Sequence, residues 1–282
     1  MCDQDHFEED LKKYSRRDMG ILTALGVGAA FMWPRVADAA DVEDQDVLIE
    51  TPDGKCDAYF VTPSSGAHAA VLVWPDIFGL RPAFKQMGKR LAESGYSVLV
   101  VNPFYRTMKA PTAEKGANTA IGEVIPLARS LSPETHTTDA KAFVAWLDKQ
   151  SQVDTTKQMG TTGYCMGGPI VFRTAAAVPE RVGAACTFHG GGLVTDGPDS
   201  PHKLIPKMQA QFLVAIAEND DQRDPQAKQV LRKSFADAGL KAEVEVYPAG
   251  HGWCPPDTRV YNEEQAEKAW ARMLALFETA LA

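Results

Sequence analysis

Six short apolar runs, rich in β-branched side chains, recur along the chain and are separated by segments of helical character. They are Ala69–Trp74, Ser97–Val101, Gln158–Tyr164, Ala184–Phe188, Phe212–Ala217 and Ala242–Tyr247. Strands that are apolar on both faces are typical of a parallel sheet covered by helices. The alternation of strands and helices therefore predicts an open, mostly parallel, doubly wound α/β sheet.

The segments between these runs carry apolar residues at helical spacing. One helix is expected to begin near Pro82, a residue suited to a first helical turn, and a second to include Ala140–Leu147. A third, Pro225–Ala238, is expected to end before a capping glycine, and the last to begin at Asn262.

Two earlier runs differ from the others because a turn dipeptide joins them directly. Asp46–Glu50 and Asp57–Thr62 flank the pair Asp53-Gly54, which predicts an antiparallel hairpin at one edge of the sheet. In such sheets, binding sites lie at the carboxyl ends of the parallel strands. The loops that follow the strands are therefore where candidate chemistry is expected.

Composition narrows the classes of protein that fit this pattern. Hydrophobic residues make up 45% of the 282 residues and charged residues 23%, which excludes a disordered or collagen-like chain. The net charge of -8 argues against a nucleic-acid partner, because phosphate binding needs a basic surface. Five cysteines are too few for a disulfide framework, and neither zinc-like spacing nor a nucleotide-binding loop occurs, so we expect no metal and no cofactor.

The first 39 residues have the order of an export signal. Ser15-Arg16-Arg17 precedes an apolar run, and Ala37-Asp38-Ala39 follows as a small-residue cleavage pattern. The adjacent arginines resemble the twin-arginine motif, which implies export of a folded protein by the twin-arginine machinery. A retained membrane anchor is the alternative, although the run is shorter than the roughly 20 residues that span a bilayer. We expect cleavage near Ala39, no stable membrane insertion afterwards, and a periplasmic or otherwise exported domain at residues 40–282.

A nucleophile motif stands between a predicted strand and a predicted helix. The segment Gly163-Tyr164-Cys165-Met166-Gly167-Gly168 has the form Gly-x-nucleophile-x-Gly, with cysteine at the central position. Glycines allow the sharp strand-to-helix turn that exposes the nucleophile, and the positive end of the helix favours a thiolate. The alternative is a buried structural cysteine beside a glycine pair that serves helix packing. The backbone N–H of Met166 is expected to face a developing oxyanion.

A base and an acid follow the nucleophile in the chain order expected for this fold. His251 lies in a glycine-flanked loop directly after the strand that ends at Tyr247, and we expect it to be the base. The preceding strand is followed by Glu218-Asn219-Asp220-Asp221. Only one of these aspartates can orient the imidazole; we prefer Asp220, with Asp221 as the alternative.

Four local motifs together resemble the dienelactone hydrolase family, the cysteine branch of the α/β-hydrolase fold. They are Pro75-Asp76-Ile77-Phe78-Gly79-Leu80, Asn102-Pro103-Phe104-Tyr105-Arg106, Gly163-Tyr164-Cys165-Met166-Gly167-Gly168 and His251-Gly252-Trp253. The resemblance implies a single domain with a triad of Cys165, His251 and Asp220 and an oxyanion hole formed by the N–H groups of Ile77 and Met166. It also implies substrate contacts from Asp76, at the position of a family glutamate that holds the thiol proton, and from Arg106, which matches an arginine that binds a carboxylate.

The expected activity is hydrolysis of a small-molecule carboxylic ester or lactone through a thioester. An exported, non-catalytic binding protein on a hydrolase fold is the alternative, because a fold does not fix a function.

Overall fold

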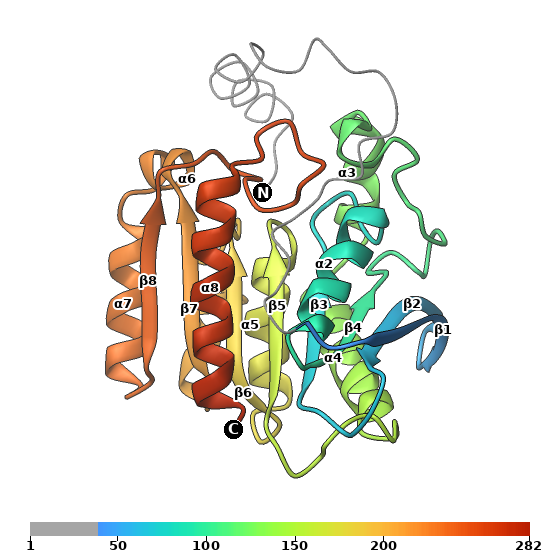
Figure 1. The fold of residues 1–282 in the computed structure, drawn as a ribbon. Coiled ribbons are helices and arrows are strands. Elements are labelled where there is room, and N and C mark those ends of the chain that lie inside the picture. Colours follow the sequence, from blue (N-terminus) through green and yellow to red (C-terminus); the bar gives the residue numbers. More distant parts are fainter. Residues whose placement is uncertain (1–38) are drawn as a thin grey trace.

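A computed structural model describes residues 39–282, so the predicted export signal lies outside the described residues except for Ala39. One eight-stranded sheet, in the order β1-β2-β4-β3-β5-β6-β7-β8, runs through this part of the chain (Figure 1). The strands are β1 (Val42–Thr51), β2 (Gly54–Pro63), β3 (Ala70–Trp74), β4 (Ser97–Val101), β5 (Met159–Tyr164), β6 (Val182–Phe188), β7 (Gln211–Ala217) and β8 (Ala242–Tyr247).

The strand pairing confirms the predicted α/β-hydrolase fold. Six neighbouring strands of the sheet pair in parallel, in the order β4-β3-β5-β6-β7-β8. β1 and β2 form an antiparallel hairpin at the edge, with Thr51 opposite Gly54 at its turn. The hairpin joins the sheet through antiparallel pairing of β2 with β4. Apart from β8 at the sheet edge, the parallel strands are buried almost throughout, which explains why their sequences read as continuous apolar runs.

Helices cover both faces of the sheet (Figure 1). They are α2 (Pro82–Glu93), α3 (Ile121–Arg129), α4 (Pro133–Leu147), α5 (Gly167–Ala177), α6 (Glu218–Arg223), α7 (Ala227–Asp237) and α8 (Glu263–Ala280), with two 3₁₀ helices, η2 (Gly116–Asn118) and η3 (Pro201–Lys207). Side chains of α4, α5 and α7 belong to one buried cluster, and those of α2 and α8 to another. Leu72 belongs to the first cluster and its neighbour Val73 to the second, as the period of two in a strand requires.

The apolar pattern predicted the helix boundaries only in part, because capping side chains also decide where a helix begins. The side chain of Asn262 accepts a hydrogen bond from the backbone N–H of Gln265, so α8 begins where the sequence predicted. The predicted helix Pro225–Ala238 is found as α7, beginning at Ala227. The short helix α6 was not predicted, because only Asn219 of its residues is buried and it has no apolar stripe. None of the helices within residues 39–282 combines the length and the apolar character needed to cross a bilayer.

Candidate active site

Cys165 occupies the sharp turn between β5 and α5. Its φ angle of 51° lies in the left-handed region, which a residue other than glycine adopts only where its surroundings hold it. The backbone N–H of Cys165 donates to the carbonyl of Phe188 at 3.0 Å, and the carbonyl of Cys165 accepts from the backbone N–H of Gly168 at 3.1 Å. These bonds fix the turn between the neighbouring strand and the start of α5.

The glycines around Cys165 are required by close backbone approach. A Cβ atom on Gly163 would lie 2.4 Å from the carbonyl oxygen of Gly167, and a Cβ on Gly167 would lie 2.4 Å from the carbonyl oxygen of Trp74. Both distances are far inside van der Waals contact, so neither position tolerates a side chain without movement of the backbone. The motif therefore allows α5 to begin directly against the ends of β3 and β5.

His251 connects the sulfur of Cys165 with a carboxylate. Its Nε2 lies 3.0 Å from Sγ of Cys165, and its Nδ1 lies 2.6 Å from Oδ2 of Asp220. The backbone N–H of His251 donates to Oδ1 of Asn219 at 2.8 Å, which joins the loop after β8 to helix α6. Three side chains from three strand ends thus form one chain of hydrogen-bonding groups, in which the sulfur can pass its proton to the imidazole.

The two candidate acids of α6 have different partners. Asp221 directs its carboxylate to Nζ of Lys228, with distances of 2.7 and 2.6 Å. Asp220 faces His251, and its other oxygen lies 3.5 Å from the guanidinium of Arg223. In this arrangement Asp220, not Asp221, is the carboxylate that contacts the imidazole.

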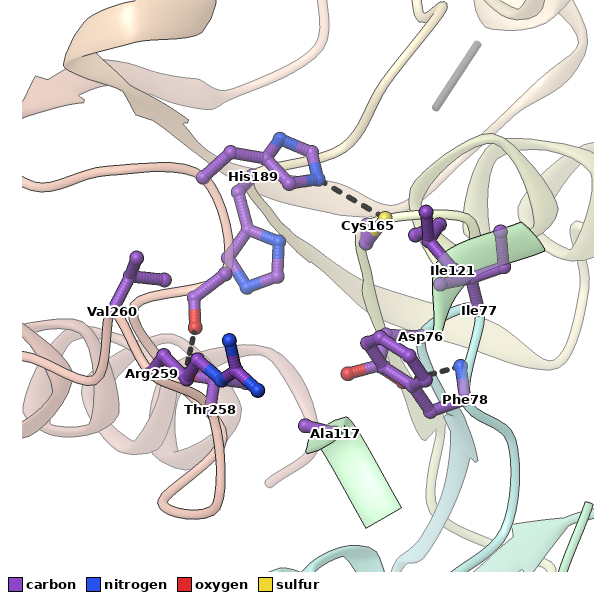
Figure 2. A pocket seen from close by; sticks show the side chains of 12 residues that line it. Asp76, Ile77, Phe78, Ala117, Ile121, Cys165, His189, Thr258, Arg259 and Val260 are labelled. Atoms are coloured by element: carbon purple, nitrogen blue, oxygen red, sulfur yellow. Dashed lines mark hydrogen bonds between the residues drawn. The ribbon is translucent and has the colours of Figure 1, made fainter. Parts of the chain in front are cut away.

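A largely apolar pocket opens in front of Cys165 (Figure 2). Figure 2 shows Cys165 and Ile77 together on one side and Thr258, Arg259 and Val260 on the other. The lining consists of Asp76, Ile77, Phe78, Ala117, Ile121, Cys165, His189, His251, Gly252, Thr258, Arg259 and Val260. Arg259 is exposed, and its Nε donates to Oδ1 of Asn118 at 3.2 Å, so the pocket carries one guanidinium at its wall.

The two backbone N–H groups predicted for the oxyanion hole belong to Ile77, which follows β3, and Met166, which precedes α5. Within residues 39–282, neither group donates a hydrogen bond to a protein acceptor. Buried backbone donors are normally paired. Ile77 lines the pocket and Met166 directly follows Cys165 in the chain, and their role as an oxyanion hole stays a prediction.

Asp76 lies in the pocket wall, 4% exposed, with its carboxylate fully engaged. Oδ1 accepts hydrogen bonds from the backbone N–H of Phe78 at 2.9 Å and from Arg81 at 2.6 Å, and Oδ2 accepts from Arg81 at 2.9 Å. The second carboxylate that contacts Arg81 is Asp257. The carboxylate of Asp76 is thus bound by Phe78 and Arg81, and the contact of Asp76 with substrate stays a prediction.

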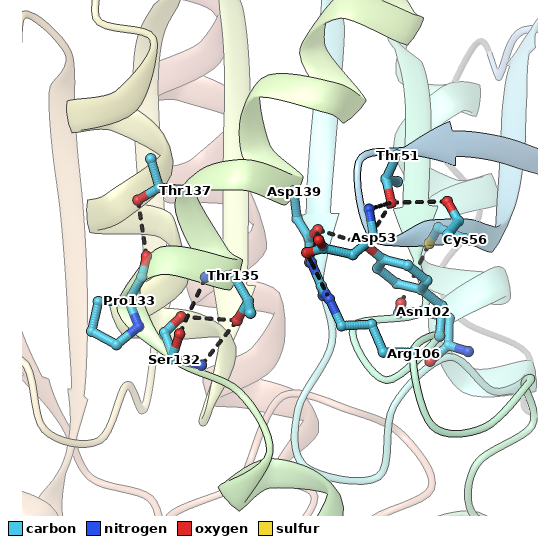
Figure 3. A network of polar contacts seen from close by, with 12 residues as sticks. Thr51, Asp53, Cys56, Asn102, Arg106, Ser132, Pro133, Thr135, Thr137 and Asp139 are labelled. Carbon is cyan, nitrogen blue, oxygen red and sulfur yellow. Dashed lines mark hydrogen bonds and ion pairs between the residues drawn. The ribbon is translucent and has the colours of Figure 1, made fainter.

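Arg106 does not line the pocket. Its guanidinium donates to both oxygens of Asp139, at 2.8 and 2.7 Å, and contacts Asp53 at the turn of the β1–β2 hairpin (Figure 3). Tyr105 donates to the same Asp139 at 2.8 Å. The role of Arg106 in binding a substrate carboxylate also stays a prediction.

His189 is a pocket residue that the sequence analysis did not single out. It is 1% exposed, has a φ angle of 42°, and its ring stands edge to face with His251 at a centroid distance of 5.0 Å. Burial, assisted by the nearby His251, holds the pKa of His189 well below its ordinary value, so the ring is neutral. Its place in the sequence, directly after β6, was a signal that it lies at the same sheet edge as the triad.

The remaining missed residues come from loops. Ala117 and Ile121 lie in and after η2, and Thr258, Arg259 and Val260 follow the loop that carries His251. Nothing in their types or spacing indicates a pocket. In the described part of the chain, no group of three or more His, Cys, Asp or Glu side chains is arranged to hold a metal ion.

Comparison with known proteins places the chain in a family. The model of the dienelactone hydrolase family matches residues 56–281. A Methylorubrum extorquens protein named "Putative carboxymethylenebutenolidase" is 29% identical over 288 residues, covering 95% of this chain and 96% of its own. A Salmonella typhi protein of the same name is 26% identical over 256 residues, covering 82% and 90%.

Solved structures show the same fold. A dienelactone hydrolase from Anabaena variabilis superposes with a TM-score of 0.63 at 16% identity, covering 86% of this chain and 99% of its own. A dienelactone hydrolase-like promiscuous phosphotriesterase from metagenomic libraries gives a TM-score of 0.71 at 20% identity, with the same coverage of 86% and 99%. At these identities the similarity concerns the fold alone.

Proposed function

Because the chain belongs to the dienelactone hydrolase family and is a carboxylic ester hydrolase, we propose that it cleaves ester or lactone bonds through Cys165, His251 and Asp220. The observation that carries this proposal is the contact of 3.0 Å between Sγ of Cys165 and Nε2 of His251, with Asp220 at 2.6 Å behind the imidazole. Since nucleophile, base and orienting acid are within proton-transfer distance, the site needs no further protein group to form a nucleophilic sulfur.

In the first half-reaction, the thiol of Cys165 transfers its proton to Nε2 of His251, and the sulfur attacks the carbonyl carbon of the substrate. The carbonyl oxygen becomes negatively charged and accepts hydrogen bonds from the N–H groups of Ile77 and Met166. Such donors stabilise a transition state by on the order of 3 kcal/mol each. The imidazolium, stabilised by Asp220, then gives its proton to the leaving oxygen as the carbon–oxygen bond breaks, which leaves a thioester.

In the second half-reaction, His251 removes a proton from a water molecule, and the resulting hydroxide attacks the thioester carbon. The carbon–sulfur bond breaks, the acid is released, and the proton on His251 returns to the sulfur. His189 stays neutral throughout, so no second positive charge forms beside the imidazolium of His251.

The nucleophile is tested with p-nitrophenyl acetate and the variant Cys165→Ala. We expect the variant to lose hydrolysis, and iodoacetamide to label wild-type Cys165 stoichiometrically with loss of activity. A Cys165→Ala variant that hydrolyses at the wild-type rate would remove the sulfur from the mechanism. The same experiment separates an enzyme from a protein that only binds esters.

The charge of the substrate is tested through two arginines. Arg259 lines the pocket, whereas Arg106 is held by Asp53 and Asp139 outside it. We expect Arg259→Met to raise KM for an anionic lactone such as cis-dienelactone and to leave KM for p-nitrophenyl acetate within twofold. A rise caused by Arg106→Met instead would support the contact predicted from the family motif.

We also propose that the protein is exported to the periplasm. The supporting observation is the order of charged, apolar and small residues in the first 39 positions. The full chain and its variant with both Arg16→Lys and Arg17→Lys are expressed in a bacterium and fractionated. We expect ester hydrolysis in the periplasmic fraction of the wild type and in the cytoplasmic fraction of the variant; equal distributions would contradict export through the twin-arginine route.

A further inference from the structure

A buried arginine next to the active site joins two carboxylates. Arg81 is 1% exposed, and its NH1 and NH2 donate to the two oxygens of Asp76 at 2.6 and 2.9 Å. Its Nε and NH2 donate to the two oxygens of Asp257 at 2.7 and 2.9 Å. Arg81 itself does not line the pocket. The guanidinium therefore binds one carboxylate on each of two sides, and it does so behind the pocket wall.

The three residues connect segments that are distant in the sequence and adjacent in the pocket. Asp76 precedes Ile77, whose N–H faces the oxyanion in the proposed mechanism, and Asp257 precedes the pocket residues Thr258, Arg259 and Val260. Oδ2 of Asp257 also accepts a hydrogen bond from the backbone N–H of Ala117 at 3.2 Å. One guanidinium thus links the loop after β3, the η2 segment and the loop after His251.

Aromatic rings enclose the same cation. The guanidinium carbon of Arg81 lies 4.8 Å from the ring centroid of Phe84 and 5.5 Å from that of Phe78. Since the side chain is shielded from water, its attraction to both carboxylates is weakly screened. A planar fork of donors also fixes the direction of each partner, which a lysine ammonium cannot do.

We propose that Arg81 is a positioning residue, which together with Asp76 and Asp257 holds the N–H of Ile77 and the three pocket walls in one arrangement. The proposal rests on the proposed function, because the position of Ile77 matters only if an oxyanion forms there. A buried ion pair is weak support for a role in stability, since desolvation of the charges offsets their attraction. Its definite consequence is geometric: the direction of the Asp76 backbone, and hence of the next N–H, follows from the position of Arg81.

The test separates oxyanion stabilisation from reactivity of the sulfur. Hydrolysis of p-nitrophenyl acetate forms an oxyanion at the N–H of Ile77, whereas alkylation of Cys165 by iodoacetamide occurs at a saturated carbon and forms none. The main variant is Asp257→Asn, which removes one charge at the more exposed end of the group; the side chain of Asp257 is 30% exposed. Asp257→Glu keeps the charge and serves as the conservative variant.

The matched control is Asp148→Asn. Asp148 pairs with Arg181 at 2.8 Å and its side chain is 31% exposed, in a contact between α4 and the start of β6 that does not line the pocket. We expect Asp257→Asn to lower kcat/KM for hydrolysis about 10- to 100-fold, the range that misplacement of a reacting group produces. We expect its rate of alkylation at Cys165 to stay within twofold of the wild type, Asp257→Glu to recover part of the hydrolysis, and Asp148→Asn to leave both rates unchanged.

Two outcomes would overturn the positioning role. Hydrolysis within twofold of the wild type in both Asp257→Asn and Arg81→Lys would mean that the group does not control the pocket. Equal losses of hydrolysis and alkylation would mean that the variants disrupt the whole site. Failure of the proposed function has a different signature, because Cys165→Ala would then retain hydrolysis whatever the Arg81 and Asp257 variants do.

Discussion

The pair Asp220 and Asp221 offers a sharp test of the triad, because neighbouring carboxylates on α6 have different partners. In the mechanism, Asp220 stabilises the imidazolium of His251 across a distance of 2.6 Å. Asp220→Asn keeps the size of the side chain and removes its charge. Asp221→Asn makes the same change one residue later, where the partner is Lys228. The two carboxylates are similarly exposed, at 23% and 18%, so the variants form a matched pair.

The magnitude follows from the charge that is lost from the hydrogen bond to His251. A hydrogen bond to a charged partner contributes about 1.5–3 kcal/mol, and the low exposure of Asp220 favours the upper half of that range. Since each 1.36 kcal/mol in the barrier is a tenfold change in rate, about 2–3 kcal/mol corresponds to a loss of about 30- to 150-fold in kcat/KM. An asparagine that favours the wrong tautomer of His251 would increase the loss further.

The assay is steady-state hydrolysis of p-nitrophenyl acetate by both variants, with urea unfolding as a control for stability. We expect the loss for Asp220→Asn only, and a kcat/KM within twofold of the wild type for Asp221→Asn. The reasoning is refuted if Asp220→Asn retains more than half of the wild-type rate, or if the two variants are equally impaired while remaining folded.

Three further predictions concern the framework of the site. Gly168→Ala would place a Cβ 2.5 Å from a side-chain oxygen of β6. We expect this variant to lose at least tenfold in activity and to lose about 1–3 kcal/mol of stability, measured by urea unfolding. In the control Gly197→Ala, the new Cβ meets nothing closer than 3.7 Å, and neither activity nor stability should change. Burial holds the pKa of His189 well below 6.5 and that of His136 at about 3. The unfolded chain therefore binds more protons than the folded chain below about pH 6.5. Each histidine should lower the free energy of unfolding by about 2 kcal/mol as the pH falls from about 7 to 5. His189→Phe should therefore lose about 2 kcal/mol less than the wild type over that interval, and an identical loss would argue against a buried neutral ring. Asn262→Ala should lower stability by about 1 kcal/mol through loss of the cap of α8, and Asn262→Gly by only a few tenths. Wild-type stability of Asn262→Ala would show that the capping bond contributes nothing.

The sequence was sufficient for the sheet and for the contact between Cys165, His251 and Asp220. Runs such as Val98–Val101 are apolar at every position because both faces of β4 are covered, so their pattern leaves little room for another fold. The glycines at 163 and 167 restrict the turn so strongly that the place of the nucleophile followed from residue types alone. Chain order then led to His251 and to the acidic pair on α6.

The walls of the pocket could not be predicted in the same way. Ala117, Ile121 and Val260 reach the site through loops and short helices whose course depends on distant contacts, such as the bond from Ala117 to Asp257. The partners of Asp76 and Arg106 were also outside the reach of the sequence. Each charge had several opposite charges available in the chain, and only the folded arrangement decides which of them it contacts.

The separation between strand ends and loops has a consequence for how this scaffold can be altered. In the proposed mechanism, the reacting sulfur is carried by a strand end that tolerates little change, as the backbone distances at Gly163 and Gly167 indicate. Part of the pocket wall belongs to η2 and to residues 258–260, which carry none of the reacting atoms of the proposed mechanism. Libraries that randomise η2 and residues 258–260 and leave the strand ends intact should yield enzymes that prefer other esters and still react through the same three side chains.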